Sequence, residues 1–411
     1  MSDFCLVRQP VFGSTGSLIG YEIRFTDAED GRAAFSRSLL SGTFDLVRNR
    51  LPAFVMASRE QLLDGAFLAA ESGSTVLLIP QQMVIDEPVI EAIARFLAVG
   101  GSIALDEVGA TPAPTESLLP HTSWVRVDAR AGDADTLAAI CARVGTPAPG
   151  AKAAPKLIAA NVEELAHYEA TLACGFQAFQ GTFFSRPEPL PASDMPQSTV
   201  AAMRLLGMAR NSDINDRQLE DVIATDPVLT FQLLRLVNSA ALGGRGVSSI
   251  GQALRLIGRN AFLRWLAVAV AAARKSKTGV DQELVRQAVE RGRLLEQLVG
   301  SGRDSGTLFL VGLFSLLDAV FRMPLPEILD RVVLSPEANN ALLVRSGPYA
   351  TALDFAESYE LGLFENATLI AKDMGVDQAK INDFYTNAIV WTAEALGAAL
   401  DAQQSGMRKA S

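Results

Sequence analysis

The chain has 411 residues, of which 49% are hydrophobic, and its formal net charge is −10. A chain of this length can bury a substantial core and is long enough for two domains. The acidic balance argues against broad contact with the phosphate backbone of nucleic acids, which relies on dense lysine and arginine patches. We therefore expect no direct nucleic-acid partner.

The cysteines and the apolar segments bear on location. Cys5, Cys141 and Cys174 are odd in number and widely spaced, which favours free thiols in a reducing compartment over a disulfide framework. The N-terminus lacks a basic segment followed by an apolar one, so we expect no secretory signal. The longest apolar stretch, 307–321, is shorter than the ~20 residues of a membrane span and contains Asp318. The sequence thus predicts a cytoplasmic protein without membrane insertion.

The first half of the chain alternates short β-rich segments with helical stretches. The β-rich segments are PAFVMAS, STVLLIP, GGSIALDEV, SWVRVDA and PKLIAANV. Such alternation predicts a parallel sheet or barrel with its functional residues at the carboxyl ends of the strands. Four prolines then fall between Pro187 and Pro196, where they prevent a regular helix and indicate a linker. We therefore expect a first domain over residues 1–190.

The remaining residues, 191–411, have the pattern of an all-α bundle. Asp226 and Pro227 supply an N-cap and a favoured first helical residue, and apolar residues at helical spacing follow up to Gly243. Further helices are predicted at 248–258, 260–275, 281–299, 307–321, 336–345 and 377–402.

Carboxylates follow several of the predicted strands. They are Glu22 after LIGY, Asp106 and Glu107 after SIAL, Asp128 after WVRV and Glu163 after IAANV. Metal-dependent hydrolysis of a phosphodiester needs several oxygen ligands that converge from different strand ends, together with a base for water. The alternative interpretation is a set of solvated strand ends without chemistry.

Five motifs carry a resemblance to a known family. In chain order they are RQPVFGSTGSLIGYEIRF, SIALDEVGA, WVRVDA, LIAANVEE and GFQAFQGTFFSRP. Together they resemble the EAL domain, a barrel of the TIM (βα)8 type known as a cyclic di-GMP phosphodiesterase. In this resemblance Glu22 matches the signature glutamate, and Asp106 with Glu107 stands where the family has two aspartates. Gln180 and Gly181 match the terminal QG of the family.

The same resemblance implies that the catalytic set is incomplete. Three family ligands fall on Met56, Leu78 and Ala160, which offer no oxygen side chain to a hard cation. The lysine that assists the attacking water corresponds to Arg126, whose guanidinium does not deprotonate. The arginine that holds a nucleotide phosphate corresponds to Thr26. We therefore expect no metal, no cofactor and no phosphodiesterase activity.

A second resemblance lies in the helical half. The segment ATDPVLTFQLLRLVNSAALGGRGVSSIGQALRLIGRNAFLRWL resembles the HDOD domain, a bundle related to the HD phosphohydrolases. The two histidines, His121 and His167, both precede the linker, so the histidine-rich metal centre of those enzymes is not expected here. Asn238 and Ser239 have two interpretations, a polar site or groups that satisfy the backbone near a helix end.

Together the resemblances imply a two-domain EAL–HDOD signalling protein whose EAL domain is degenerate. The expected function is a catalytically inactive adaptor in cyclic di-GMP signalling, related to motility or biofilm behaviour, that binds unidentified protein partners; a homo-oligomer stays open. The alternatives are an effector that binds cyclic di-GMP without cleaving it and a residual metal-dependent phosphodiesterase. A vestigial ligand pocket would comprise Glu22, Asp106, Glu107, Arg126, Asp128, Glu163 and Gln180.

Overall fold

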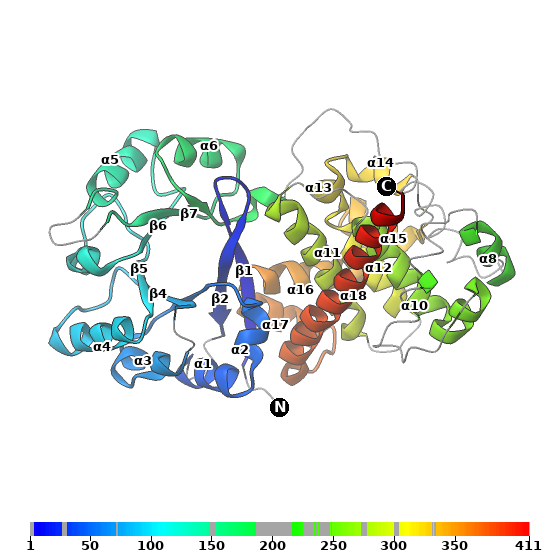
Figure 1. Ribbon diagram of the computed structural model, residues 1–411, viewed down its shortest axis with the longest axis horizontal. Helices are drawn as coiled ribbons and strands as arrows, with labels where there is room; N and C mark the ends of the chain where they lie inside the picture. Colours follow the sequence, from blue (N-terminus) through cyan, green and yellow to red (C-terminus); the bar gives the residue numbers. More distant parts are fainter. Residues whose placement is uncertain are drawn as a thin grey trace.

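A computed structural model describes most of the chain as a barrel beside a helical bundle (Figure 1). The described residues are 4–26, 31–70, 73–147, 153–185, 216–224, 233–234, 237, 247, 249–272, 278–299, 304–330, 332 and 334–410. The predicted linker around residue 190, the predicted helix from Pro227 to Gly243 for the most part, and both Asn238 and Ser239 lie outside these residues. The expected division at residue 190 therefore stays a prediction.

Eight strands close into a barrel in chain order. They are β1 (Leu6–Gly13), β2 (Leu18–Phe25), β3 (Ala53–Met56), β4 (Thr75–Ile79), β5 (Ser102–Leu105), β6 (Trp124–Asp128), β7 (Lys156–Ala160) and β8 (Ala178–Phe179). Strands β2 to β8 run parallel, so their carboxyl ends meet at one mouth of the barrel. The predicted α/β barrel of the TIM type is confirmed.

Strand β1 departs from the parallel pattern because it runs antiparallel to both β2 and β8. The connection from β1 to β2 is a tight turn in which Gly13 N donates to Ser17 O at 2.7 Å and Gly16 has φ +75°. A turn this short can join only antiparallel strands, because a parallel crossover needs a dozen or more residues. The amino-terminal end of β1 consequently lies at the barrel mouth.

Side chains fill the inside of the barrel. They come from alternate positions of the strands, as expected for the period of two in a β-strand. The buried interior residues are Val11, Phe54, Val76, Leu78, Ala104, Ile158 and Ala178. A ligand can therefore reach the barrel at its mouth and not through its centre.

Helices cover the outside of the barrel. They are α1 (Gly31–Leu40), α2 (Thr43–Arg48), α3 (Arg59–Leu63), α4 (Glu87–Ala98), α5 (Ala134–Val144) and α6 (Leu165–Ala173), with short 3-10 turns η1 (Ala66–Ala69), η2 (Pro114–His121) and η3 (Thr182–Ser185). In helix α4 the sequence explains both the start and the buried face. Asp86 caps the start by accepting from Val89 N, and Ile93 and Phe96 face the core.

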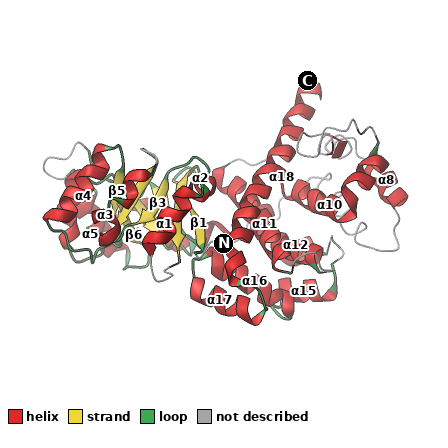
Figure 2. Cartoon of the chain, turned by 90° about the horizontal axis from the view of Figure 1, so that it is seen from below, coloured by secondary structure: helices red, strands yellow, loops and turns green. Residues whose placement is uncertain are grey.

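The second half is a helical bundle, as predicted (Figure 2). Its described elements are α8 (Asp216–Ala224), α10 (Ile250–Ala272), α11 (Gly279–Leu298), α12 (Ser305–Phe314), α13 (Leu317–Phe321), α14 (Leu325–Leu329), α15 (Pro336–Leu343), α16 (Pro348–Glu360), α17 (Phe364–Asp373), η5 (Gln378–Lys380) and α18 (Ile381–Ala410). Among the described helices, none combines the length and the apolarity needed to cross a membrane.

Three details of the bundle differ from the predicted helices. The helices predicted at 248–258 and 260–275 are assigned together as α10, although Gly258 has φ +77° and separates them. The helix predicted at 307–321 is divided into α12 and α13, because the chain leaves helical geometry at Leu316. Helices α16 and α17 were not predicted, and α16 contacts the barrel.

Helix α11 lies against the outer face of the β1–β2 hairpin (Figure 1). At its start Val280 N donates to Gly16 O at 3.0 Å. Farther along, Tyr21 donates to Glu283 at 2.9 Å, and Arg8 forms a buried ion pair with Glu290 at 2.5 Å. The bundle thus replaces the crossover helix that the short β1–β2 connection does not contain.

Candidate functional site

The barrel mouth brings four of the predicted site residues together in one buried cluster. Arg126 on β6 donates from Nε and Nη2 to both carboxylate oxygens of Asp106, the second at 2.7 Å. Its Nη1 lies 2.9 Å from Glu22 Oε2 on β2. Gln180, just after β8, donates to Glu22 and accepts from Arg126. The guanidinium of Arg126 on β6 therefore joins two carboxylates and a carboxamide, which come from β2 and from the carboxyl ends of β5 and β8.

Charge pairing decides the ionisation of this cluster. Burial alone would raise the pKa of Glu22, but the nearby guanidinium groups of Arg126 and Arg24 lower its pKa to about 2. Glu22 is only 2% exposed. It is therefore a buried, ionised carboxylate at neutral pH, and such a group is tolerated only when it is paired and hydrogen-bonded.

A second group of predicted residues lies at the exposed rim of the mouth. Arg130 pairs with Asp128 at 3.0 Å and with Glu163 at 2.9 Å. Asn161 donates to Asp128 at 2.9 Å. Partial burial raises the pKa of Asp128, but the hydrogen bonds from Arg130 and Asn161 outweigh it and leave the pKa below its usual range. Sequence reasoning found the two carboxylates but missed Arg130 and Asn161.

Glu107 occupies a different place from its neighbour Asp106. Its backbone has φ +53°, in the left-handed region that few residues other than glycine adopt. Its N–H donates to Asp106 Oδ1 at 2.8 Å, and its side chain is exposed. Glu107 therefore supports the buried cluster through its backbone rather than through its carboxylate.

The oxygen atoms at the mouth are not arranged to coordinate a divalent metal ion. Hard cations such as Mg²⁺ require about six oxygen ligands. Here the oxygens of Glu22 and Asp106 accept from Arg126 instead. Leu78 and Ala160, at the ends of β4 and β7, contribute only buried hydrocarbon. Across the described ranges, no group of three or more histidine, cysteine, aspartate or glutamate side chains could hold a metal ion.

Two further residues, Gln9 and Arg24, connect the cluster to the bundle and were missed from the sequence. Arg24 lies 3.1 Å from Glu22 and donates to Leu361 O at 3.2 Å. Gln9 accepts from Gln180 at 3.3 Å and donates to Glu360 O at 3.0 Å. Arg24 stands two positions after Glu22 on the same strand, and this spacing could have indicated it. Gln9 pairs with Glu22 across β1 and β2, which only the hairpin register reveals.

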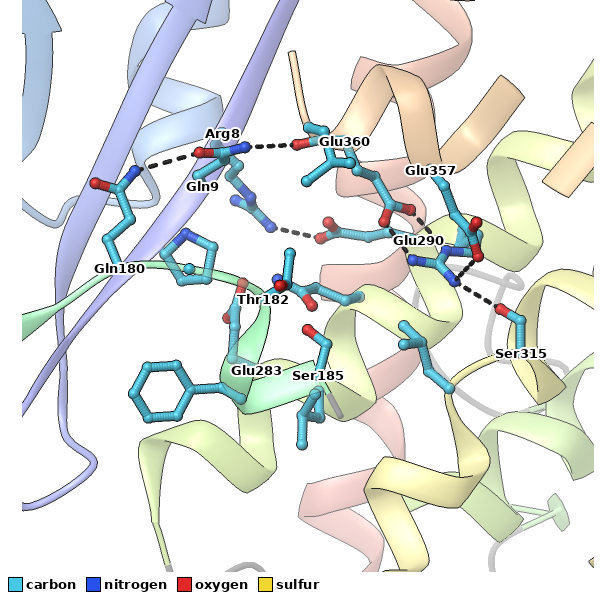
Figure 3. A pocket seen from close by; sticks show the side chains of 18 of the residues that line it. Arg8, Gln9, Gln180, Thr182, Ser185, Glu283, Glu290, Ser315, Glu357 and Glu360 are labelled. Atoms are coloured by element: carbon cyan, nitrogen blue, oxygen red, sulfur yellow. Dashed lines mark hydrogen bonds and ion pairs between the residues drawn. The ribbon is translucent and has the colours of Figure 1, made fainter. Parts of the chain in front are cut away.

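A cavity of about 810 Å³ lies between the mouth and the bundle (Figure 3). The barrel contributes side chains from β1, from the rim and from η3, and the bundle contributes side chains from α11, α13 and α16. Charged and polar lining residues include Arg24, Arg130, Gln180, Glu283, Arg291 and Glu360. The mouth therefore opens toward a space that is shared by both halves of the chain and is lined by charged as well as apolar side chains.

Comparison with known proteins gives matches to both halves. Residues 195–330 match the family model of the HDOD domain. Over 408 residues the chain is 26% identical to the cyclic di-GMP phosphodiesterase CdgJ of Vibrio cholerae, covering 95% of this chain and 92% of that protein. It is 24% identical to the uncharacterized protein YuxH of Bacillus subtilis, covering 94% and 97%.

Solved structures of EAL domains match the first half. The EAL domain of Mycobacterium smegmatis DcpA is 18% identical, with a TM-score of 0.36, and the match covers 43% of this chain and 90% of that structure. The phosphodiesterase PaMucR in complex with c-di-GMP is 17% identical, with a TM-score of 0.36, over 46% of this chain and 98% of that structure.

The expectation of a catalytically inactive adaptor is contradicted by the match with CdgJ. That relative bears the name of an enzyme, and the alignment extends across nearly the whole of both chains. The expectation was based on five substituted motif positions taken together, Met56, Leu78, Ala160, Arg126 and Thr26. Because an active site depends on how all its groups are arranged in space, substitutions read from motif positions were an inadequate basis for excluding activity.

Proposed function

We propose that this protein is a cyclic di-GMP phosphodiesterase that binds its substrate at the barrel mouth. The observation that carries the proposal is the alignment with CdgJ, which includes both the barrel and the bundle. The position of the charged residues supports it, since functional groups of barrels of this type lie at the carboxyl ends of the strands. The residues proposed to form the ligand site, either by supporting it or by contacting the substrate, are Glu22, Asp106, Glu107, Arg126, Asp128, Glu163 and Gln180.

The residues of the mouth divide into a supporting group and a contact group. Arg126, Glu22 and Asp106 are buried and bound to one another, so they hold the strand ends in place. At the exposed rim, Arg130 donates one hydrogen bond from each of its three nitrogens to Asp128 or Glu163, and its remaining N–H groups can donate to a phosphodiester. We assign phosphate contact to Arg130 on this ground.

Hydrolysis adds water across one phosphodiester bond of the ring. The water oxygen bonds to phosphorus, the bond from phosphorus to one ribose oxygen breaks, and that oxygen leaves with a proton. Asp128 and Glu163 lie beside Arg130, so one of these carboxylates can accept the proton of the water and pass it to the leaving ribose oxygen. Because the side chains at the mouth do not fit a metal ion, this mechanism uses the side chains alone.

The cellular role is proposed from the family resemblance. We propose that the protein acts in cyclic di-GMP signalling that affects motility or biofilm behaviour. We also propose that it is located in the cytoplasm, binds protein partners and forms a homo-oligomer. Deletion of the gene followed by motility and biofilm assays would test the phenotype, and light scattering of the purified chain would test the oligomeric state.

The direct test is hydrolysis by the full-length protein. Cyclic di-GMP is incubated with the chain in Mg²⁺, in Mn²⁺ and in EDTA, and linear product is separated by anion-exchange chromatography. We expect linear dinucleotide, with turnover about tenfold slower in Arg130→Ala because one charge-assisted phosphate contact is lost. Absence of linear product in all three conditions would refute the proposed function, and an unchanged rate in Arg130→Ala would refute the assignment of Arg130.

A further inference from the structure

The end of helix α16 contacts the barrel mouth at two adjacent backbone carbonyls. Gln9 donates to the carbonyl of Glu360, and Arg24 donates to the carbonyl of Leu361 (Figure 3 for Gln9). On their other sides, Gln9 accepts from Gln180, and Arg24 holds the Glu22 carboxylate. Each contact therefore leads from the bundle to the buried cluster through a single side chain.

These carbonyls are natural acceptors for such contacts. Helix α16 ends at Glu360, and the last carbonyls of a helix have no partner inside the helix. They also form the negative end of the helix dipole, which favours a guanidinium or an amide donor at that place. The contacts thus satisfy exposed backbone groups of the bundle with polar groups of the barrel.

The end of α16 is itself fixed inside the bundle. Arg291 on α11 donates to both carboxylate oxygens of Glu360, at 2.9 and 2.5 Å, and to Ser315 at 2.8 Å. Arg291 is buried and Glu360 is partly buried, so this forked ion pair is partly shielded from water. A shift of α11 relative to α16 would therefore move the carbonyls that hold Gln9 and Arg24.

Close packing around Arg24 leaves little freedom at this point. Gly362 has φ +73°, and a methyl group added there would meet Arg24 Cδ at 3.1 Å. A glycine is needed here both for its backbone conformation and for the approach of the arginine.

We propose that the helical bundle sets the geometry of the barrel mouth through Gln9 and Arg24, which act as positioning residues for Gln180 and Glu22. This inference rests on the proposed phosphodiesterase function. The bundle is then a control element: a molecule that binds to it and moves the α16 end changes the rate of hydrolysis at the mouth.

The experiment compares four single variants and one double variant of the full-length chain with the wild type. Gln9→Ala and Arg24→Ala break the contact from the barrel side, and Gly362→Ala disturbs it from the bundle side. Arg264→Ala is the matched control, because Arg264 pairs with Glu296 at 2.6 Å within the bundle. For each protein, kcat and KM for cyclic di-GMP and the thermal unfolding midpoint are measured.

We expect kcat to fall about tenfold in Arg24→Ala and in Gly362→Ala, the loss typical of one charge-assisted hydrogen bond, and about threefold in Gln9→Ala, whose hydrogen bonds are neutral, with a smaller change in KM. The double variant Arg24→Ala with Gly362→Ala should be no slower than the slower single variant, because both act through one contact. Arg264→Ala should retain the wild-type rate.

The outcomes separate this inference from the function on which it rests. Wild-type turnover with unchanged kcat in all three contact variants would overturn the inference and leave the proposed function intact. A fall in kcat that follows the unfolding midpoint, and that occurs equally in Arg264→Ala, would assign the effect to stability and also overturn it. If the wild type itself gives no linear product, the proposed function fails and the inference fails with it.

Discussion

At the barrel mouth, one guanidinium lies between two buried carboxylates. Arg126 is 7% exposed, and its partners Glu22 and Asp106 are exposed still less. Removing one member of a buried charged group leaves the others without compensation, and this costs far more than the loss of a surface ion pair. The stability of the mouth should therefore depend on Arg126.

Arg126→Ala should lower the free energy of unfolding at pH 7 by about 3–5 kcal/mol, because it removes the guanidinium bound to buried Asp106 and leaves buried Glu22 with Arg24 as its remaining ion-pair partner. Without the Arg126 guanidinium, burial should raise the pKa of Glu22, so the variant should recover part of its deficit at pH 5 as Glu22 takes up a proton. Urea unfolding at both pH values measures this. Arg59→Ala, which breaks the exposed pair with Asp86, is the control and should change stability little. Equal losses in the two variants would contradict the prediction.

Glu290 gives a second prediction, on pH. Burial raises the pKa of Glu290, and the nearby negative charge of Glu283 raises it further. The positive charge of Arg8 lowers it by less, so the pKa of Glu290 rises from 4.5 to about 7. Between these pH values the folded protein binds more protons than the unfolded chain, so this group's stabilising contribution falls as the pH rises. Glu290→Gln should flatten the fall in unfolding free energy between pH 5 and 7, and the exposed variant Glu365→Gln should not. If the unfolding free energy of Glu290→Gln fell with pH as steeply as that of the wild type, Glu290 would not be the group responsible.

At the scale of elements, the strands were predicted better than the helices that act on the site. Each predicted β-rich segment contains a strand, from β3 within PAFVMAS to β7 within PKLIAANV. Short apolar runs bounded by turn residues are a local signal, so sequence suffices. Helix α16 was not predicted although its sequence carries a signal, since the buried residues Ala352, Phe355, Ala356 and Tyr359 have the spacing i, i+3, i+4, i+7 of an apolar stripe.

The candidate site was predictable in part for the same reason. Sequence alone indicated that Glu22, Asp106, Asp128 and Glu163 follow strands and would share the mouth. It did not indicate that Arg126 pairs with Glu22, since β2 and β6 are distant in the chain and the pairing depends on which side chains point into the mouth. The division into a buried cluster and an exposed rim likewise required the three-dimensional arrangement.

Helices α11 and α12 pack closely enough to require glycine at their contact. A methyl group on Gly312 would lie 2.7 Å from the Cα of Gly292, and one on Gly292 would lie 2.7 Å from Phe309 O. Gly312→Ala should therefore cost about 1–3 kcal/mol of unfolding free energy through overpacking. Gly306→Ala, on the same helix with open space around it, should be neutral or slightly stabilising. Chemical denaturation of both variants tests this, and equal effects would contradict it.

At the scale of the whole molecule, the barrel and the bundle share buried contacts. Besides the Arg8–Glu290 ion pair, Tyr21 donates to Glu283, and Tyr359 on α16 donates to Leu6 O at 2.9 Å. Contacts between independent domains are usually more polar and exposed than these. The two halves should therefore unfold together.

Differential scanning calorimetry should show one transition whose calorimetric and van't Hoff enthalpies agree. Tyr359→Phe should lower the midpoint of that single transition, because it leaves the buried Leu6 carbonyl without its donor, at a cost of about 1–3 kcal/mol. Two separated transitions in the wild type would show that the halves are independent.

The position of α11 against the β1–β2 hairpin bears on how such a chain can evolve. A gene fragment that encoded the barrel alone would expose the outer face of the hairpin, where Arg8 and Tyr21 now contact acidic side chains of α11. Recombination that separated the two coding regions would have to supply a replacement helix at the same time. We therefore expect lineages with this hairpin to inherit barrel and bundle as one genetic unit.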